Sequence, residues 1–287
     1  MLDSLVLKKF KDYLNLIRFD KPIGFLLLMW PCWFGLSILN LNLNILLFWL
    51  FIFFIGSFFM RSAGCIINDI VDRDIDKNIT RTDQRPIASK NISIMEAVFL
   101  LTIFLLISFL ILLQFNFTTI IVGLLSTPLI VIYPFMKRIT YWPQIILGIV
   151  FNWGVLIVTV QFNNALTAEF VFLYIGCVFW TLGYDTVYAY QDRKDDIKQG
   201  IKSTAVFFGE NGRIFVNFCY LIVVLIFGYL GWHSSNSIFS LIIIAMIGIC
   251  TYIAIQKWNI NSSKSSGFYF RQNNNFAIML FLYLSIF

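Results

Sequence analysis

Residues 45–76 read ILLFWLFIFFIGSFFMRSAGCIINDIVDRDID, an apolar half followed by an acidic half. This stretch indicates the fold class of the protein. Residues 45–67 are almost entirely apolar and match the roughly 20 residues that an α-helix needs to cross the hydrocarbon core of a bilayer. Residues 68–76 carry four aspartates directly after that apolar run. The stretch therefore predicts a membrane-spanning helix that delivers a cluster of carboxylates to one membrane surface.

The chain as a whole is also strongly hydrophobic and poor in charge. Hydrophobic residues make up 59% of the 287 residues and charged residues 13%, whereas soluble domains carry roughly 25% charge. The composition excludes a soluble globular domain, a disordered chain and a disulfide scaffold. It predicts an all-α, polytopic membrane protein, because helices satisfy their own backbone groups inside lipid. The net charge of +6 is explained by membrane topology, so no nucleic-acid partner is expected.

Apolar segments recur along the chain and predict about nine transmembrane helices. When the chain is threaded through them, all 21 lysines and arginines fall on one side of the membrane. Basic loops stay in the cytoplasm, so the N-terminus is predicted to be cytoplasmic, with residues 1–21 forming an arm on the membrane surface. The predicted segments are 22–40, 45–67, 93–114, 117–135, 143–161, 168–190, 212–232, 236–256 and 274–287.

The first aspartate cluster reads NDIVDRDID (68–76) and closes the second apolar segment. At 100° per residue, Asp69, Asp72 and Asp76 fall within about 60° of one another on a helix. The sequence therefore predicts that these three carboxylates share one helical face.

The second cluster reads DTVYAYQDRKDD (185–196) and closes the sixth apolar segment. Asp185, Tyr188, Asp192 and Asp196 also follow a helical spacing, which predicts a second stripe of carboxylates. Both clusters contain the pattern D-R-x-x-D, which indicates an internal repeat of one functional helix end.

Two such clusters predict a site for a hard cation. Oxygen ligands without cysteine or histidine select ions such as Mg²⁺, which proteins usually hold by a few carboxylates together with substrate phosphates. Basic residues near both clusters supply the other half of a diphosphate site. The predicted diphosphate-binding residues are Arg61, Arg81, Arg85 and Lys202.

Two other interpretations of the acidic clusters stay open. Aspartates beside a membrane are often only solvated charge, although two matched copies at the ends of spans favour a function. A cation transporter would place its ionisable groups near the bilayer midplane in broken helices. The interiors of spans such as 97–113 and 214–231 carry no charge, which favours an enzyme.

The chain resembles the UbiA superfamily of intramembrane aromatic prenyltransferases. The N-D-x-x-D-x-x-x-D pattern marks the superfamily, and YPFMKR, DTxYAxxD and GIKSTA resemble its 4-hydroxybenzoate polyprenyltransferase branch, which serves ubiquinone biosynthesis. The resemblance implies a single domain over 1–287, with a central cavity that opens sideways to lipid and cytoplasmic cap loops at 68–92 and 191–211. The stretches that carry it are RFDKPIG (18–24), NDIVDRDID (68–76), TRTDQRPIAS (80–89), YPFMKR (133–138) and YDTVYAYQDRKDDIKQGIKSTAVFFG (184–209).

The resemblance also implies roles for single residues. Arg138 is expected to hold the carboxylate of the aromatic acceptor. The predicted catalytic carboxylates are Asp69, Asp185 and Asp192, and one role for such a group is to accept the ring proton. The expected Mg²⁺ ligands are Asn68, Asp72, Asp76, Asp192 and Asp196.

The expected reaction transfers a polyprenyl group from a polyprenyl diphosphate to the ring of 4-hydroxybenzoate, ortho to the hydroxyl, in a Mg²⁺-dependent step. The product would be 3-polyprenyl-4-hydroxybenzoate. Haem, naphthoate and homogentisate are alternative acceptors, although a single histidine weighs against haem. The expected surroundings are membrane lipid, in a bacterial cell inner membrane with the site facing the cytoplasm. No protein partner is inferred.

Overall fold

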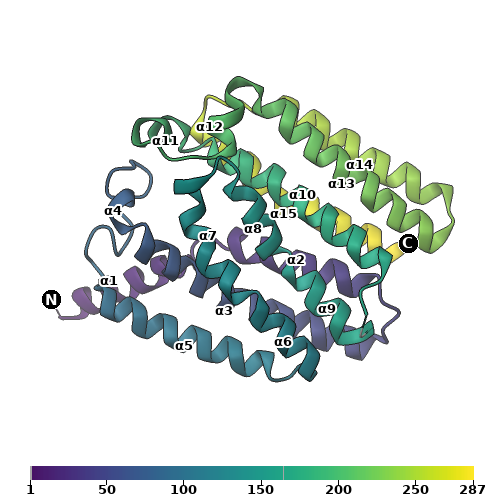
Figure 1. Cartoon of the computed structure of the whole chain (residues 1–287), viewed down its shortest axis with the longest axis horizontal. Helices are drawn as coiled ribbons and strands as arrows, with labels where there is room; N and C mark the ends of the chain where they lie inside the picture. The colour runs from purple at the N-terminus through teal and green to yellow at the C-terminus, as the bar shows by residue number, and fades with distance from the viewer. Residues whose placement is uncertain (1, 164) are drawn as a thin grey trace.

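The computed structural model describes the backbone of residues 2–163 and 165–287, so Met1 of the predicted arm lies outside the described residues. All regular secondary structure in these two ranges is helical, as the composition predicts. Long helices lie side by side, and the short helices α4, α11 and α12 gather at one end (upper left in Figure 1), here called the cap end. The helices are α1 (Leu2–Leu16), α2 (Ile23–Ser37), α3 (Leu43–Val71), α4 (Arg73–Asp76), α5 (Ile94–Leu112), α6 (Phe117–Leu125), α7 (Thr127–Ile139), α8 (Pro143–Phe151), α9 (Trp153–Asn163), α10 (Ala168–Ala189), α11 (Arg193–Gln199), α12 (Thr204–Phe208), η1 (Gly209–Asn211), α13 (Gly212–Ser235), α14 (Ile238–Gln256) and α15 (Ser263–Ile286).

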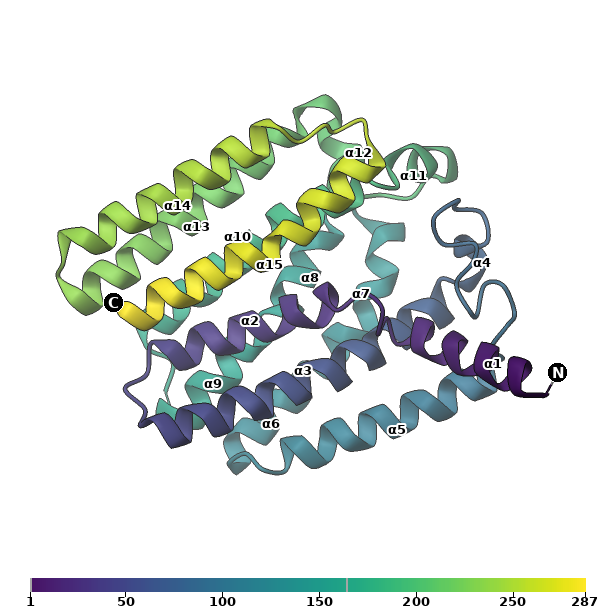
Figure 2. The same ribbon diagram turned by 180° about the vertical axis from the view of Figure 1, so that it is seen from behind.

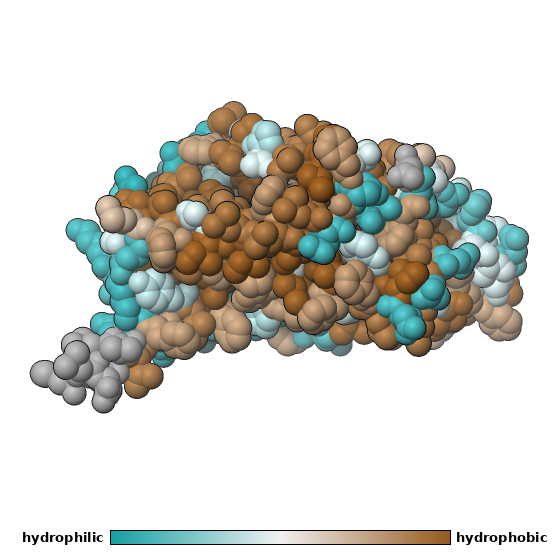
Figure 3. All heavy atoms as spheres, turned by 90° about the horizontal axis from the view of Figure 1, so that it is seen from below, coloured by the Kyte–Doolittle hydropathy of each residue, from teal (hydrophilic) through white to brown (hydrophobic). Residues whose placement is uncertain are grey.

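Each of the nine predicted segments coincides with a described helix or with two consecutive helices. Seven helical stretches in the described chain have the length and apolar composition needed to cross a membrane. The helix α2 is apolar but only 15 residues long, and α15 is long but more polar. Apolar side chains also cover much of the outer surface, as Figure 3 shows for one face. The predicted all-α, multi-pass architecture is confirmed, with nine as an approximate count.

The last predicted segment, 274–287, is too short, because α15 already begins at Ser263. The N-terminal half of α15 is polar in sequence, yet Asn273 within this helix is buried. The Asn273 side-chain oxygen accepts a hydrogen bond from the indole of Trp180 at 2.9 Å and another from the hydroxyl of Tyr220. These partners allow a polar residue to lie inside the bundle, which hydropathy alone does not anticipate.

The fourth and fifth predicted segments are each broken into two helices. The break between α6 and α7 lies at Ser126, whose hydroxyl donates to the carbonyl of Gly123 at 2.7 Å, and a proline follows in the first turn of α7. The break between α8 and α9 lies at Asn152, whose side-chain amide donates to the carbonyl of Gly148. Side chains that bond to nearby carbonyls compete with the helical ladder, so both breaks have a local cause.

The helix α10 is the most buried of the long helices and packs against α13, α8 and α15. The helix α2 packs against α3, α9 and α15, which ties the two halves of the bundle together. At the cap end α1 lies beside α3 and α5, while α15 ends at the opposite end of the molecule (Figures 1 and 2).

Candidate active site

The first aspartate motif lies where α3 ends. The helix stops at Val71, Asp72 leaves the helical conformation (φ −94°, ψ 1°), and α4 then carries Asp76. The helix predicted to carry Asp69, Asp72 and Asp76 on one face is therefore interrupted at Asp72, although all three carboxylates line one cavity. The backbone N–H of Asp76 donates to the carbonyl of Asp72 at 2.8 Å, so the break is a defined turn.

The second motif has the same local backbone. The helix α10 ends at Ala189, Asp192 adopts φ −109° and ψ 1°, and α11 carries Asp196. The backbone N–H of Asp196 donates to the carbonyl of Asp192 at 2.9 Å, as in the first motif. The two D-R-x-x-D sequences thus form the same turn, which agrees with an internal repeat.

Both turns face one cavity of about 770 Å³. Of the twelve residues predicted for the site, Arg138 alone is absent from the lining of this cavity. The structure therefore brings together carboxylates and cations that are far apart in the sequence. The predicted residues that line it are Arg61, Asn68, Asp69, Asp72, Asp76, Arg81, Arg85, Asp185, Asp192, Asp196 and Lys202.

Four cations form ion pairs with the three buried carboxylates of the first motif. These carboxylates have side-chain exposures of 2–4%, so unpaired charge there would be costly. Two of the cations, Arg18 and Lys137, have no role in the site predicted from the sequence. The ion pairs are Arg18–Asp69 (2.7 Å), Arg85–Asp69 (3.1 Å), Arg85–Asp76 (2.8 Å), Lys137–Asp72 (2.5 Å) and the longer Arg138–Asp72 (3.9 Å).

In the described part of the chain, the second motif has one ion-pairing cation inside the cavity. The Arg81 Nε donates to Asp192 Oδ1 at 2.7 Å, and a second contact joins the Arg81 Nη2 and Asp192 Oδ2. The guanidinium also lies over the ring of Tyr188, with its central carbon 5.0 Å from the ring centroid. Burial, reinforced by the charge of Asp192, raises the pKa of Asp196 to about 7. The second motif is therefore short of positive charge.

The two predicted cap loops meet over the cavity. Arg81 belongs to the first loop and Asp192 to the second, and the Gln199 side chain donates to the carbonyl of Asn78 at 2.7 Å. Gly200 ends α11 in the left-handed conformation (φ +68°), which a glycine adopts without strain. The turn brings Lys202 back toward α7, where its Nζ donates to the carbonyl of Ile139 at 2.9 Å.

Aromatic side chains form the wall beneath the carboxylates. Tyr188 packs against Phe270 of α15, with ring centroids 4.7 Å apart, and Tyr184 lies 6.0 Å from the same ring. Arg61 lies over the ring of Phe151 at 5.3 Å, and its buried Nε has no hydrogen-bond partner among the described residues. The lining of the cavity therefore changes from charged side chains at the aspartate turns to aromatic side chains next to them.

The deeper part of the cavity is apolar. Phe53 and Phe115 line it, and both pack against Trp49, with ring centroids 6.1 and 4.8 Å away, at the end remote from the carboxylates. On one side the lining includes Phe109 of α5 and Leu124 of α6, which are 43% and 49% exposed. This end of the cavity is therefore lined by accessible apolar side chains.

The donor atoms suit Mg²⁺, but they are not gathered into a closed metal cage. In residues 2–163 and 165–287, no three His, Cys, Asp or Glu side chains lie close enough together to hold an ion by themselves. The buried Asp72 Oδ1 has no hydrogen-bond partner, which leaves one oxygen available to a ligand. Ligands that are all oxygen and partly unsatisfied fit an ion that also binds substrate phosphates.

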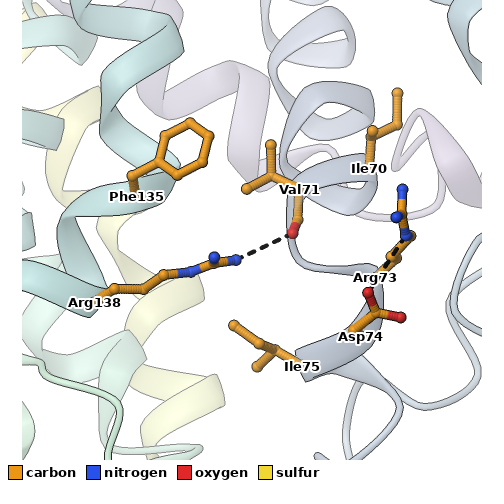
Figure 4. Close-up of a pocket in the computed structure, with 7 residues that line it drawn as sticks. All are labelled: Ile70, Val71, Arg73, Asp74, Ile75, Phe135 and Arg138. Carbon is orange, nitrogen blue, oxygen red and sulfur yellow. Dashed lines mark hydrogen bonds and ion pairs between the residues drawn. The ribbon is translucent and has the colours of Figure 1, made fainter.

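Arg138 lines a second pocket, of about 620 Å³, beside the turn after α3 (Figure 4), and its Nη2 lies 3.9 Å from Asp72 Oδ1. Its guanidinium points at the end of α3 and donates to the carbonyl of Val71 at 3.2 Å. Phe135 of the same helix forms part of the apolar wall. The neighbouring Lys137 instead lines the main cavity beside Asp72, a contact that the sequence does not predict.

A bundle of apolar helices with two matched aspartate turns above one cavity defines a membrane-embedded enzyme for substrates with an anionic head and an apolar tail. The chain belongs to the UbiA prenyltransferase family, whose sequence profile matches residues 28–282.

Several relatives match over most of their length. The chain is 38% identical over 280 residues to the 4-hydroxybenzoate octaprenyltransferase of Coxiella burnetii (strain CbuK_Q154), covering 96% of this chain and 94% of the relative. The enzyme of the same name from Blochmanniella pennsylvanica is 37% identical over 278 residues, with 96% and 95% covered. The mitochondrial 4-hydroxybenzoate polyprenyltransferase of Drosophila melanogaster is 36% identical over 285 residues, with 95% and 70% covered.

Solved structures show the same fold at low sequence identity. A UbiA homologue from Aeropyrum pernix K1 without ligand superposes with a TM-score of 0.71 at 20% identity, covering 92% of this chain and 97% of the homologue. A UbiA homologue from Archaeoglobus fulgidus bound to GPP and Mg²⁺ gives a TM-score of 0.66 at 18% identity, with 94% and 99% covered.

Proposed function

We propose that the protein transfers a polyprenyl group from a polyprenyl diphosphate to the ring of 4-hydroxybenzoate, ortho to its hydroxyl, giving 3-polyprenyl-4-hydroxybenzoate. One observation carries the proposal: both aspartate turns and four predicted cations face a single cavity that continues into an apolar chamber. The charged end matches a diphosphate, and the apolar chamber matches an isoprenoid tail. The relatives named as 4-hydroxybenzoate prenyltransferases support the choice of acceptor.

The donor head is proposed to bind at the cap end. Asn68, Asp72 and Asp76 on one side and Asp192 and Asp196 on the other would hold Mg²⁺, as the oxygen-only donor set favours. When bound, Mg²⁺ neutralises the diphosphate and makes it a better leaving group. A homologue that was solved with GPP and Mg²⁺ supports this ion.

The protein's cations would bind the diphosphate oxygens. Arg81, Arg85 and Lys202 line the carboxylate end of the cavity, and Arg61 lies deeper along α3. In the structure Arg81 and Arg85 are paired with Asp192 and Asp76. A metal ion held by these carboxylates would compensate their charge and leave both arginines free to bind the diphosphate.

The chemistry would take place between the charged and aromatic zones. Breaking the carbon–oxygen bond of the donor leaves an allylic cation, which the rings of Tyr184 and Tyr188 can stabilise through their faces. The ring carbon of the acceptor forms the new bond, and its proton then leaves to a carboxylate, for which Asp185 and Asp192 both line the cavity. Asp69 is ion-paired to two arginines and is better placed to hold them than to move a proton.

The acceptor carboxylate is proposed to bind Arg138, whose Nη2 lies 3.9 Å from Oδ1 of Asp72, a residue that lines the main cavity. A guanidinium beside the ring of Phe135 suits an aromatic acid. The substitution Arg138→Lys keeps the positive charge but loses the bidentate geometry. We expect the KM for 4-hydroxybenzoate to rise roughly tenfold, the scale of a charged hydrogen bond, while the KM for the donor stays the same. An unchanged KM for 4-hydroxybenzoate would remove Arg138 from the acceptor site.

The chain is proposed to work as one domain over 1–287 in the bacterial inner membrane, with the loops 68–92 and 191–211 capping the site on the cytoplasmic side. The placement of its basic residues at the ends of spans supports that orientation. It can be tested by labelling single cysteines introduced near 78–85 and at Ser235, which the proposal places on opposite sides.

The experiment that tests the proposal is an assay of the purified protein in lipid nanodiscs with geranyl diphosphate and Mg²⁺. The candidate acceptors are 4-hydroxybenzoate, homogentisate, a dihydroxynaphthoate and haem, each offered separately, with products identified by mass spectrometry. We expect prenylated 4-hydroxybenzoate, with activity lost in EDTA and restored by Mg²⁺. Product from another acceptor and none from 4-hydroxybenzoate would overturn the assignment.

A further inference from the structure

Arg18 connects the N-terminal arm to the carboxylate end of the cavity. It follows α1, and its Nη2 lies 2.7 Å and 2.8 Å from the two carboxylate oxygens of Asp69. The Asp69 side chain is 2% exposed and the Arg18 side chain 19% exposed, so water screens this pair only weakly. The arm thus supplies a charge to a motif that lies more than fifty residues away in the sequence.

The backbone conformation of Arg18 is unfavourable for an arginine, which indicates that the position of its side chain has a function. Its φ angle is +58°, in the left-handed region that residues other than glycine rarely adopt. The turn that ends α1 would accept a glycine more easily. Strained backbone that persists at a cavity commonly has a functional reason. Here the strained residue places a guanidinium on a buried carboxylate.

Other contacts hold the arm in place without Arg18. Leu16 is fully buried in a small core with Ile66 of α3 and with Ile92, which precedes α5. The Tyr13 hydroxyl donates to Glu96 at 3.0 Å, and Lys9 pairs with the same carboxylate at 2.8 Å. The docking of the arm and the contact with Asp69 can therefore be tested separately.

Asp69 is shared between two arginines. Arg85 Nη1 lies 3.1 Å from Asp69 and 2.8 Å from Asp76, so it bridges the two carboxylates. If Arg18 were absent, the full charge of Asp69 would attract Arg85 alone and draw it away from Asp76. Because Arg85 lines the cavity, its position determines what it can offer to a bound anion.

We propose that Arg18 is a positioning residue: by sharing the charge of Asp69, it keeps Arg85 directed at the donor diphosphate. The inference rests on the proposed function, since it assumes that a prenyl diphosphate binds in this cavity. It assigns to the N-terminal arm a role in donor affinity in addition to membrane contact.

The substitution Arg18→Gly tests the proposal, because glycine relieves the backbone strain while it removes the guanidinium. We expect a smaller loss of stability than for Asp69→Asn, because Arg85 still pairs with Asp69, together with a Kd for geranyl diphosphate in Mg²⁺ that is raised about tenfold. Binding is measured by calorimetry on protein in nanodiscs, so no turnover is needed. An unchanged Kd would refute the proposal.

Two further variants separate positioning from arm docking. Lys9→Met weakens the arm at Glu96 without touching Asp69, and we expect its Kd for geranyl diphosphate to be unchanged. In an Asp69→Asn background the charge that Arg18 shares is gone, so adding Arg18→Gly should cause no further loss of affinity. A loss of equal size in Lys9→Met, or additive losses in the double variant, would reduce Arg18 to a structural contact. If the unmodified protein bound no geranyl diphosphate, this result would refute the proposed function itself, and with it the role of Arg18.

Discussion

The two aspartate motifs have the same backbone turn but different surroundings. In each, an aspartate outside the helical conformation directly precedes a short helix, which presents a second aspartate four residues later. Around the first motif, Arg18, Arg85, Lys137 and Arg138 form ion pairs with the three buried carboxylates. Around the second, Arg81 pairs with one carboxylate.

The comparison shows that the backbone geometry of each motif and the number of cations around it have separate origins. A repeated sequence explains the repeated turn, because the D-R-x-x-D pattern has the same local preferences in both places. The cations come from elsewhere in the chain, so they are free to differ between the copies. Within the described residues, cations pair with all three buried carboxylates of the first motif, whereas in the second Asp192 is paired and Asp196 is not, so a metal ion would add compensation at Asp196.

The largest expected effect concerns the central aspartate of each turn. Asp72→Asn and Asp192→Asn should each lower turnover by about 10² to 10³-fold, the scale of losing one electrostatic contact to a developing charge. Asp195→Asn is the matched control, since Asp195 belongs to the second motif but lines neither pocket. Rates are measured with saturating 4-hydroxybenzoate. Near-normal turnover in either central variant would limit the site to one motif.

The single cation paired with the second motif should matter more for donor affinity than one of the four cations paired with the first. We expect Arg81→Met to raise the KM for the donor by about tenfold, which corresponds to about 1.4 kcal/mol. Lys137→Met should raise it less, because Arg85 remains beside the first motif. Steady-state kinetics with varied geranyl diphosphate gives both values. The reverse order would contradict the charge difference between the motifs.

The same difference predicts opposite effects on stability without metal. Asp69→Asn leaves two arginines without their shared partner, and we expect the unfolding free energy to fall by about 3 kcal/mol. Asp196→Asn removes a buried carboxylate that is short of compensating charge, so stability should be unchanged or higher. Thermal unfolding in EDTA compares them. Equal losses in both variants would show that the two motifs are compensated alike.

Much of the fold could be predicted from the sequence. A helix in lipid must satisfy its own backbone and needs roughly 20 apolar residues, so apolar segments locate the spans with little reference to the rest of the chain. The exceptions involve contacts between distant residues. The polar start of α15 depends on Trp180 and Tyr220, and hydropathy cannot register these partners.

The site was predictable where the pattern is local and not where it depends on packing. The carboxylates of both motifs follow from their spacing, and they do line one cavity. Lys137 and Arg138 are neighbours on one helix, yet they lie on different pockets, and the sequence does not tell which of them faces inward. The contact between Arg18 and Asp69 requires knowing where the arm docks.

The central claim is that both aspartate turns act on one donor diphosphate, and Mg²⁺-dependent binding tests it most directly. Calorimetry with geranyl diphosphate would compare the unmodified protein, Asp72→Asn and Asp192→Asn, each with Mg²⁺ and with EDTA. The account predicts that the unmodified protein binds only with Mg²⁺ and that each single variant loses most of that Mg²⁺-dependent affinity. Full affinity in either variant would mean that its turn serves a different purpose.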